Sequence, residues 1–556
     1  MPRHACHGFV RAISAGCGLL WAIGCARPFD ASTAIGPPLQ SLREIETVGL
    51  EKRSRSDPVT VEEAAQEALQ EIISPPDPPQ TRQLTLPEVR AATLANNLDL
   101  QVELVSPTIA QTTVDEEQAK FESIFTGSAR RSLTDRPTEF VTQSSQATIN
   151  SFELGLRVPL PTGGTASVNF PFGRSETDNP FSAFGGAAAF DADVRFSISQ
   201  PLLRGAWAET NTYSIRVAEY ENKITNARTK LEAIRILANA DRAYWLLYAA
   251  RRELEVRRQE YDLALEQLEQ ARRKVAAGDA PPIEITRAES GVAERLEAII
   301  IAETIVLRQQ RDLKRIMNHP DLPMDSPTFI VPTTDPDPLY LDLDPVALGE
   351  YAVSNRMEML ELELQLAIDA STIDLQRNSA LPLVVLDYSY NIGGLGGSFG
   401  RVFDQISERS FEDWSVGLTA EIPIGNEAAK ARVRRAILTR LQRLASRDLR
   451  RTAILQEVYD AVDRLNQDWQ RILAARQAAI LAGRTYEAEQ RQFEVGLRTS
   501  TDVLDAAARL ADAQSREVRA LADYQIARVN IAFGTGTLLG HDRVRWEPRE
   551  SQEVTK

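Results

Sequence analysis

The chain contains very little cysteine. Its 556 residues include three, and all three lie within the first 25 positions: Cys6, Cys17 and Cys25. The rest of the sequence therefore has no means of forming a disulfide bond or a thiolate-ligated metal site. The four histidines and five methionines are scattered without the spacing of metal ligands. We accordingly expect no metal site.

Basic residues are also in deficit. The sequence has 63 Lys and Arg against 78 Asp and Glu, which gives a formal net charge of −15. Binding of a phosphate backbone requires clustered Lys and Arg, so this balance argues against a nucleic-acid partner. The hydrophobic content of 43% and the charged content of 25% are ordinary for a folded protein and exclude wholesale disorder.

Long hydrophobic runs are missing. No stretch reaches 18 consecutive apolar residues, so the sequence predicts no transmembrane helix. Residues 1–26 nevertheless have the charged start and the short apolar run of a signal peptide. The segment AIGC (22–25) resembles a lipoprotein cleavage box with Cys25 as the lipidated residue. Ala22 is an unusual first residue for that box, so lipidation stays open. Export without a helical anchor leaves either a soluble secreted protein or a membrane β-barrel.

The pattern along the chain predicts a leader followed by two similar halves. Residues 27–80 are rich in proline and poor in hydrophobic pattern, which predicts an extended leader. The halves cover 84–320 and 343–540, with a linker at 321–342 and a C-terminal tail at 541–556. These limits define the predicted domains.

Two landmarks support the internal repeat. Asn97 matches Asn355 in the helical segments that open the halves, and Gly278 matches Gly496 in two glycine turns. Between the landmarks the first half is about 40 residues longer than the second. That interval is also where both halves show the pattern of strands.

Alternating apolar and polar side chains predict strands at about 121–201 and at about 382–422. The clearest example is DWSVGLTAEI (413–422), where every second residue from the tryptophan is apolar. The extra residues of the first half hold a further hairpin near 150–172. A soluble sheet with one wet face shows the same alternation, so the strands alone leave both interpretations open.

Two very long helices follow the strands. Glu209 to Ala276 contains neither proline nor glycine, and Glu427 to Val495 contains Gly483 as its one helix breaker. At 1.5 Å per residue, each helix is about 100 Å long. A single globular core cannot cover such helices, so we expect them to pack side by side as coiled coils.

A shorter helix runs back after each long one, so the sequence predicts helical hairpins at about 209–317 and about 427–533. With the strands before them, these hairpins give an α+β architecture in which each half contributes strands, a descending helix, a turn and an ascending helix.

Residues 84–540 resemble the TolC family of outer-membrane efflux proteins. The segments that carry the resemblance are LTLPEVRAATLANNLDL (84–100), SISQPLLRG (197–205), EIPIGNEAAKARVRRA (421–436) and FEVGLRTSTDVLDAAARL (493–510). The resemblance implies a trimeric α+β membrane protein with two internal repeats per chain. A shared outer-membrane β-barrel is then continued by a long α-helical coiled-coil tunnel in the periplasm. The typical member has two strands per half, so the extra hairpin near 150–172 is a departure.

An argument from the strands agrees with a shared barrel. One chain has too few strands to close a conducting barrel, and an open sheet edge is not stable against lipid. The resemblance implies an outer-membrane channel that acts as the passive exit duct of a tripartite efflux or type I secretion system. Its partners would be two further copies of the chain, a periplasmic adaptor, an inner-membrane pump and outer-membrane lipid.

We expect neither enzymatic activity nor a cofactor. The sequence has no nucleophile elbow, P-loop, paired-histidine zinc motif or GxGxxG at a strand-to-helix turn. The alternative to a channel is a secreted or lipid-anchored coiled-coil protein that acts as a scaffold or adaptor. That alternative explains the helices and the signal, but not the symmetric strand segments.

The two turns supply candidate site residues. Glu284 and Asp502 each lie six residues after a turn glycine, and Asp505 lies one helical step beyond. Acids in a first helical turn gain about 0.3–1 kcal/mol from the helix dipole, which is one interpretation. Threefold symmetry would instead turn each acid into a negative ring that favours cations. The resemblance implies that Asp502 and Asp505 line the periplasmic gate, where crowding should raise at least one pKa.

The resemblance implies two further roles for turn residues. Arg498 matches an arginine that holds the coiled coils shut through an ion pair, with a solvated turn residue as the alternative. Phe493 stands where the best-known member has a tyrosine, so a hydroxyl is missing here. We expect the adaptor to contact the small and apolar residues around the glycines: Ala277, Gly278, Gly496 and Leu497.

Overall fold

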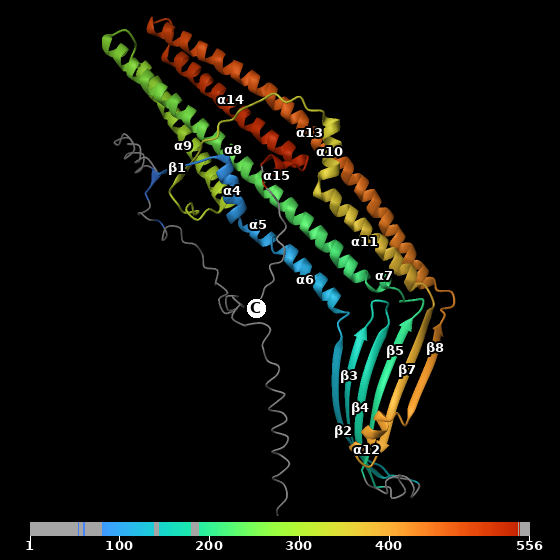
Figure 1. The fold of residues 1–556 in the computed structure, drawn as a ribbon. Coiled ribbons are helices and arrows are strands. Elements are labelled where there is room, and N and C mark those ends of the chain that lie inside the picture. Colours follow the sequence, from blue (N-terminus) through green and yellow to red (C-terminus); the bar gives the residue numbers. More distant parts are fainter. Residues whose placement is uncertain are drawn as a thin grey trace, which may run out of the picture. The chain divides into compact units, whose positions relative to one another are not determined.

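Figure 1 shows a computed structural model of the chain. The structure describes residues 80–137, 144–178 and 188–542, together with positions 54, 59–61, 139 and 544. The predicted signal peptide, Cys25, most of the predicted leader and most of the predicted tail lie outside the described residues.

Among the described residues, six strands form one antiparallel sheet in the order β2-β3-β4-β5-β7-β8. Their bounds are Ile124–Asp135 (β2), Gln146–Pro159 (β3), Thr165–Thr177 (β4), Ala189–Pro201 (β5), Leu383–Gly396 (β7) and Glu412–Glu421 (β8). β5 pairs with β7, so strands from both predicted halves share the sheet. Each segment predicted as a strand contains a strand, and the extra hairpin of the first half lies between β2 and β5.

One face of the sheet is apolar across neighbouring strands. Phe196 pairs with Tyr390, and Tyr390 pairs with Trp414. On the other side of Phe196, Val168 is its partner, and Val168 in turn pairs with Leu156. Successive side chains of a strand point to opposite faces, so this register gathers the apolar residues of five strands on one surface.

The opposite face carries small polar residues in the same register. Ser197 pairs with Ser167 on one side and with Ser389 on the other, and Ser389 pairs with Ser415. The hydroxyls of Ser167 and Ser197 lie 2.7 Å apart, and those of Ser389 and Ser415 lie 2.8 Å apart. The sheet therefore has one apolar and one hydrophilic surface.

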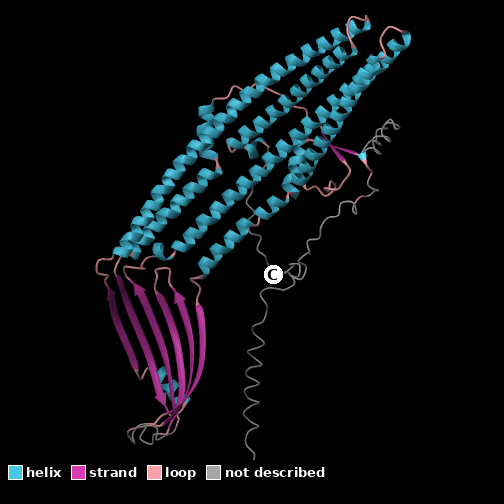
Figure 2. Cartoon of the chain, turned by 180° about the vertical axis from the view of Figure 1, so that it is seen from behind, coloured by secondary structure: helices cyan, strands magenta, loops and turns pink. Residues whose placement is uncertain are grey.

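Two long helical hairpins extend from the sheet, as predicted. The first consists of α8 (Tyr213–Ala277) and α9 (Ile283–Met317), and the second of α13 (Glu427–Glu494) and α14 (Ser500–Gly534). Figures 1 and 2 show the sheet at one end of residues 80–542 and the turns of both hairpins at the other. α14 also packs against α8, which joins the hairpins along their length.

Shorter helices pack along the long ones, in the half of the long helices that is nearer to the sheet. α4 (Leu86–Asn96), α5 (Leu98–Glu103) and α6 (Ser106–Ala119) pack on α8, whereas α10 (Pro345–Asn355) and α11 (Met357–Ser379) pack on α13. The remaining elements are short: β1 (Thr81–Leu84), α7 (Ala208–Asn211), β6 (Phe329–Pro332), α12 (Phe399–Ser407) and α15 (Leu538–His541). β1 and β6 form a two-stranded parallel sheet.

The largest buried cluster lies where α4, α8, α9 and β6 meet. It includes Tyr244, Leu247, Leu313 and Ile330, which are fully buried. The Tyr244 hydroxyl donates to the Leu84 carbonyl (3.2 Å) and accepts from a backbone N–H of the linker (2.9 Å). This cluster fixes the first hairpin midway between the sheet and the turns.

Among the described helices, none combines the length and the apolar character that crossing a lipid bilayer requires.

Candidate functional site at the hairpin tips

The two hairpin turns have the same backbone structure. Gly278 and Gly496 have φ angles of +81° and +82°. The N–H of each glycine donates to the carbonyl three residues earlier (3.0 Å), and the next N–H donates to the carbonyl five residues earlier (2.9 Å). This is the Schellman pattern that ends helices at a left-handed residue. Each turn uses five residues, 278–282 and 495–499, before the next helix begins.

Asp502 caps the helix in which it lies. Its carboxylate accepts hydrogen bonds from the Thr499 N–H (2.9 Å) and the Thr499 hydroxyl (2.8 Å), and that hydroxyl accepts from the Asp502 N–H (3.3 Å). The backbone and hydroxyl hydrogen bonds from Thr499 lower the pKa of Asp502. Within one chain Asp502 therefore completes a capping box, while Asp505 is exposed on the same helix.

Glu284 caps the other hairpin. It is buried, with 7% of its surface exposed, and its carboxylate accepts from the Ser500 N–H at 3.1 Å. The second carboxylate oxygen lies 2.6 Å from the Arg287 guanidinium. Ser500 also accepts from the Gln267 amide through its hydroxyl, at 3.1 Å. Glu284 therefore lies in the packing between α9 and α14 instead of repeating the contacts of Asp502.

Phe493 forms a second link between the hairpins. Its ring is buried at the end of α13, and the Lys274 ammonium lies 3.8 Å from the ring centroid. The same ammonium donates a hydrogen bond to the Phe493 carbonyl. A cation over an aromatic face contributes roughly 0.5–2 kcal/mol, the larger value where water is excluded. The face of the Phe493 ring, which has no hydroxyl, thus links α13 to α8 through the Lys274 ammonium.

Arg498 turns back onto its own hairpin. Its Nε lies 3.0 Å from a Glu489 carboxylate oxygen and donates to the Gln492 side-chain oxygen at 3.1 Å. Both partners belong to α13. In this chain the ion pair expected across neighbouring helices is made with the helix that immediately precedes the turn.

Residues 348–537 match the family model described as outer membrane efflux protein. The chain is 23% identical over 359 residues to the outer membrane protein TolC of Vibrio cholerae, which covers 63% of this chain and 77% of that protein. It is 25% identical over 204 residues to TolC of Escherichia coli, covering 35% and 41%. The CmeC outer membrane channel of Campylobacter jejuni has the same fold, with a TM-score of 0.59, 14% identity, and coverage of 81% and 85%. The chain is thus similar in sequence to the TolC outer-membrane proteins, its second half matches the outer membrane efflux protein family, and its fold is that of an outer-membrane channel.

These similarities support the resemblance that the sequence indicated. TolC-like proteins are non-enzymatic outer-membrane transport conduits with a β domain and a periplasmic helical tunnel. Within the described ranges, no three His, Cys, Asp or Glu side chains are grouped as metal ligands.

The sequence interpretation missed a buried arginine at the TolC-like tip. Arg295 donates to the Leu504 carbonyl of α14 and to the Gly291 carbonyl of α9, both at 3.1 Å, and its Nε lies 3.4 Å from Glu260. A Cβ on Gly291 would lie 2.7 Å from the Leu504 side chain. A lone glycine inside a helix is a signal of close helix approach and could have pointed to this contact.

The residues expected to contact an adaptor lie at the surface of the turns. Ala277, Gly278 and Gly496 are exposed, and Leu497 exposes 76% of its surface. Val495, which the sequence interpretation did not include, is 71% exposed beside them. The tip of the second hairpin therefore presents two large apolar side chains to solvent.

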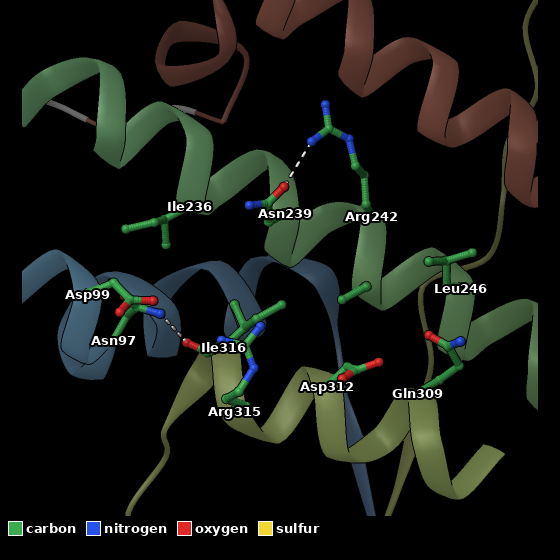
Figure 3. A pocket seen from close by; sticks show the side chains of 11 residues that line it. Asn97, Asp99, Ile236, Asn239, Arg242, Leu246, Gln309, Asp312, Arg315 and Ile316 are labelled. Atoms are coloured by element: carbon green, nitrogen blue, oxygen red, sulfur yellow. Dashed lines mark hydrogen bonds between the residues drawn. The ribbon is translucent and has the colours of Figure 1, made fainter. Parts of the chain in front are cut away.

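A pocket of about 350 Å³ lies away from the tips, where α4 and α5 meet α8 and α9 (Figure 3). Three of its polar side chains make hydrogen bonds within the protein. Asn97 donates to the Ile316 carbonyl at 2.8 Å, and Arg242 donates to Asn239 at 2.9 Å and to Asn530 of α14. We attribute this pocket to the joint between helices and not to a ligand.

Proposed function

We propose that the chain is the outer-membrane exit duct of a tripartite efflux or type I secretion system. In this proposal three copies form one channel, and a periplasmic adaptor couples it to an inner-membrane pump. The observation that carries the proposal is the two-faced sheet with open edges, continued by two hairpins that end in matching turns.

The edges of the sheet support sharing between copies. Within the six-stranded sheet of the described residues, β2 and β8 each have a neighbour on one side only, and every residue of β8 is exposed. The outer backbone groups of these strands need partners, because a lipid bilayer offers none. Pairing β8 of one copy with β2 of the next satisfies both edges, and repeating it around a threefold axis closes a barrel. The apolar face then meets lipid and the serine rows line the lumen.

The tips support the role of a gate. Three copies would bring three Asp502 and three Asp505 carboxylates to one narrow opening. The resulting negative potential favours cations and opposes anions. Crowding of the carboxylates would also oppose the lowering of the Asp502 pKa that Thr499 causes in one chain.

The exposed turns support a contact with an adaptor. Val495 and Leu497 place apolar surface at the far end of the second hairpin, and Ala277 and Gly278 place small residues at the first. The apolar side chains offer a surface to bury, and the small residues leave the backbone uncovered. Another helical tip can therefore approach closely. The pump selects the cargo in this proposal, since the duct itself supplies neither energy nor chemistry.

The first test is the mass of the protein after extraction from membranes in mild detergent. One chain has a mass of 61.7 kDa, so three copies have about 185 kDa before removal of a signal peptide. A detergent-dependent trimer from the outer membrane that conducts ions in planar bilayers is the expected result. A monomer or dimer that stays in solution without detergent would contradict the duct and favour the scaffold alternative. Intact-mass measurement also decides whether Cys25 carries lipid.

A further inference from the structure

The hairpin β3–β4 is an integral part of the sheet. β3 pairs along its full length with β2 on one side and with β4 on the other, from Gln146 to Arg157 and from Ala147 to Pro159. β4 pairs in turn with β5. The two strands contain 14 and 13 residues, as long as the strands around them. The hairpin therefore widens the sheet instead of covering one of its faces.

The turn of this hairpin is fixed to the place where β5 leads into the helices. The Thr162 hydroxyl donates to the Gln200 side-chain oxygen (2.8 Å), and the Gln200 amide donates to the Thr162 carbonyl (3.0 Å). Gly163 has a φ of +90°, and a Cβ there would lie 2.1 Å from the Gly205 carbonyl oxygen. Such close approach requires glycine, so this turn is built to dock at the base of the sheet.

Both added strands carry the two-faced pattern. Phe152, Leu154 and Leu156 lie on the apolar face and are partly exposed. Ser167 and Asn169 lie on the polar face, where Ser167 contacts Ser197 of β5. The added strands therefore match their neighbours on the surface toward lipid and on the surface toward the lumen.

We propose that this chain forms an 18-stranded barrel, with six strands from each of three copies, and that its mouth admits bulky or polymeric hydrated solutes. The proposal rests on the shared barrel of the proposed function. The typical family pattern of two strands per half would give 12 strands. Each copy here adds two more, and the sheet edges at β2 and β8 remain the ones that meet.

The additional strands change the size of the mouth. With neighbouring strands about 4.8 Å apart and tilted by about 40°, 18 strands give a barrel about 36 Å across, and 12 give about 24 Å. Side chains that line the wall reduce each diameter by about 10 Å. Free openings of about 26 Å and about 14 Å remain, so solutes between these hydrated diameters distinguish the two barrels.

The experiment measures entry of neutral polyethylene glycols of graded size from the extracellular side of channels in planar bilayers. Polymers added there probe the mouth directly, independent of the gate at the far end. The matched variant deletes residues 144–178, which removes β3 and β4 and leaves β2 antiparallel to β5. We expect the size limit to fall from about 26 Å in the full chain to about 14 Å in the variant. Equal limits, or a limit near 14 Å for the full chain, would overturn the proposal.

A second measurement tests the proposal independently if the deletion variant does not assemble. Single cysteines placed along β2 and β8, in a background whose own three cysteines are replaced by serine, should form disulfides between copies and yield cross-linked trimers. Pairs placed on β4 and β7, which do not face an open edge, are the control. Failure of every β2–β8 pair in a conducting trimer would overturn the 18-stranded barrel alone. Loss of both conductance and the detergent-dependent trimer in the full chain would instead count against the duct.

Discussion

Gly278 and Gly496 hold a backbone conformation that residues with a Cβ avoid. A Cβ on either glycine would meet no heavy atom within 4 Å among the described residues beyond its chain neighbours. Space is therefore available at both positions, and the requirement for glycine comes from the backbone angle. The effect of a substitution there should be local to the turn.

We predict that Gly496→Ala destabilises the tip by about 1 kcal/mol, because alanine is strained at this φ angle. Amide hydrogen exchange in residues 493–500 should become about fivefold faster. The matched control is Gly483→Ala inside α13, where a Cβ would make an ordinary contact at 3.8 Å with Leu510. That control should stabilise the helix by about 0.5–1 kcal/mol. Equal changes of the same sign in both variants would contradict the argument.

A buried acid at the C-terminal end of α15 gives a prediction about pH. Burial, and then the charge of Asp241, raise the pKa of Asp542 to about 7, while Arg90 opposes the shift. Arg90 lies 2.8 Å from Asp241 and 2.7 Å from Asp542, so one guanidinium serves two carboxylates. His541 lies beside this group, and burial lowers its pKa.

A carboxylate with a raised folded-state pKa disfavours the folded state once it ionises. Stability should therefore fall as pH rises from about 4 to about 7 through this group, and then level off. Asp542→Asn should remove that loss and raise the melting temperature at pH 8 relative to the unmodified protein. Thermal unfolding in detergent between pH 4 and 8 measures it, and an unchanged difference between the two proteins across that range would contradict the prediction.

At the scale of elements, the contacts between the hairpins are as informative as the hairpins. Lys274 on α8 binds the ring and the carbonyl of Phe493 on α13. Glu284 on α9 caps Ser500 at the start of α14. These contacts join residues more than 200 positions apart in the sequence, and they hold the two turns of one chain together.

We predict that Lys274→Met loosens this connection by about 1–2 kcal/mol, because it removes the cation and its hydrogen bond while keeping a long side chain. Hydrogen exchange should accelerate by roughly fivefold or more at both turns, although only one is altered. Arg273→Met is the control, since Arg273 is the exposed neighbour on the same helix. Faster exchange at the first turn alone would show that the hairpins are not coupled through this pair.

The elements themselves followed from simple patterns in the sequence. Absence of proline and glycine over Glu209–Ala276 predicted a helix there, and the structure has one over Tyr213–Ala277. Alternation predicted the segments that form the six-stranded sheet, whereas the short strands β1 and β6 were not predicted. These signals are local, since a side-chain period or a helix breaker acts within a few residues.

The directions of the tip side chains did not follow from the sequence. Glu284 and Asp502 occupy matching positions in the two hairpins. Asp502 accepts hydrogen bonds from the N-cap residue Thr499 of its own helix. The N-cap residue before Glu284 is Pro282, which offers no side-chain hydrogen bond, and Glu284 instead accepts from the Ser500 N–H of the other hairpin. The partner of Phe493 was missed for a similar reason, because it depends on how the two hairpins are set against each other. The place of β3–β4 does not follow from the sequence either, since a hairpin inside the sheet and one outside it share the same alternation.

At the scale of the whole molecule, the fold is retained at low sequence identity. The CmeC channel matches 81% of this chain with 14% identity. The architecture requires few particular residues: glycine at the two turns, a narrow apolar stripe along each helix, and alternation along each strand. In the proposed channel, the remaining positions would set properties such as the charge at the gate.

We predict that replacing Asp502 and Asp505 together by asparagine lowers the preference for cations severalfold, because the carboxylate ring would be lost. Reversal potentials under a salt gradient in planar bilayers measure the preference, and block by multivalent cations should weaken in parallel. Glu427→Gln, an exposed acid at the other end of α13, is the control and should leave both unchanged. Unaltered selectivity in the double variant would leave helix capping as the role of Asp502.

The links between Lys274 and Phe493, Glu284 and Ser500, and Arg295 and Leu504 have a mechanical consequence. They make the two hairpin tips of each copy a single rigid unit. In a channel of three copies, the opening would then be formed by three rigid units and not by six independent hairpins. Movement on opening would occur at the contacts between copies. Such an opening would widen by rigid-body rotation of each pair of tips. A force that an adaptor applies to one turn would therefore be transmitted to the other turn of the same copy.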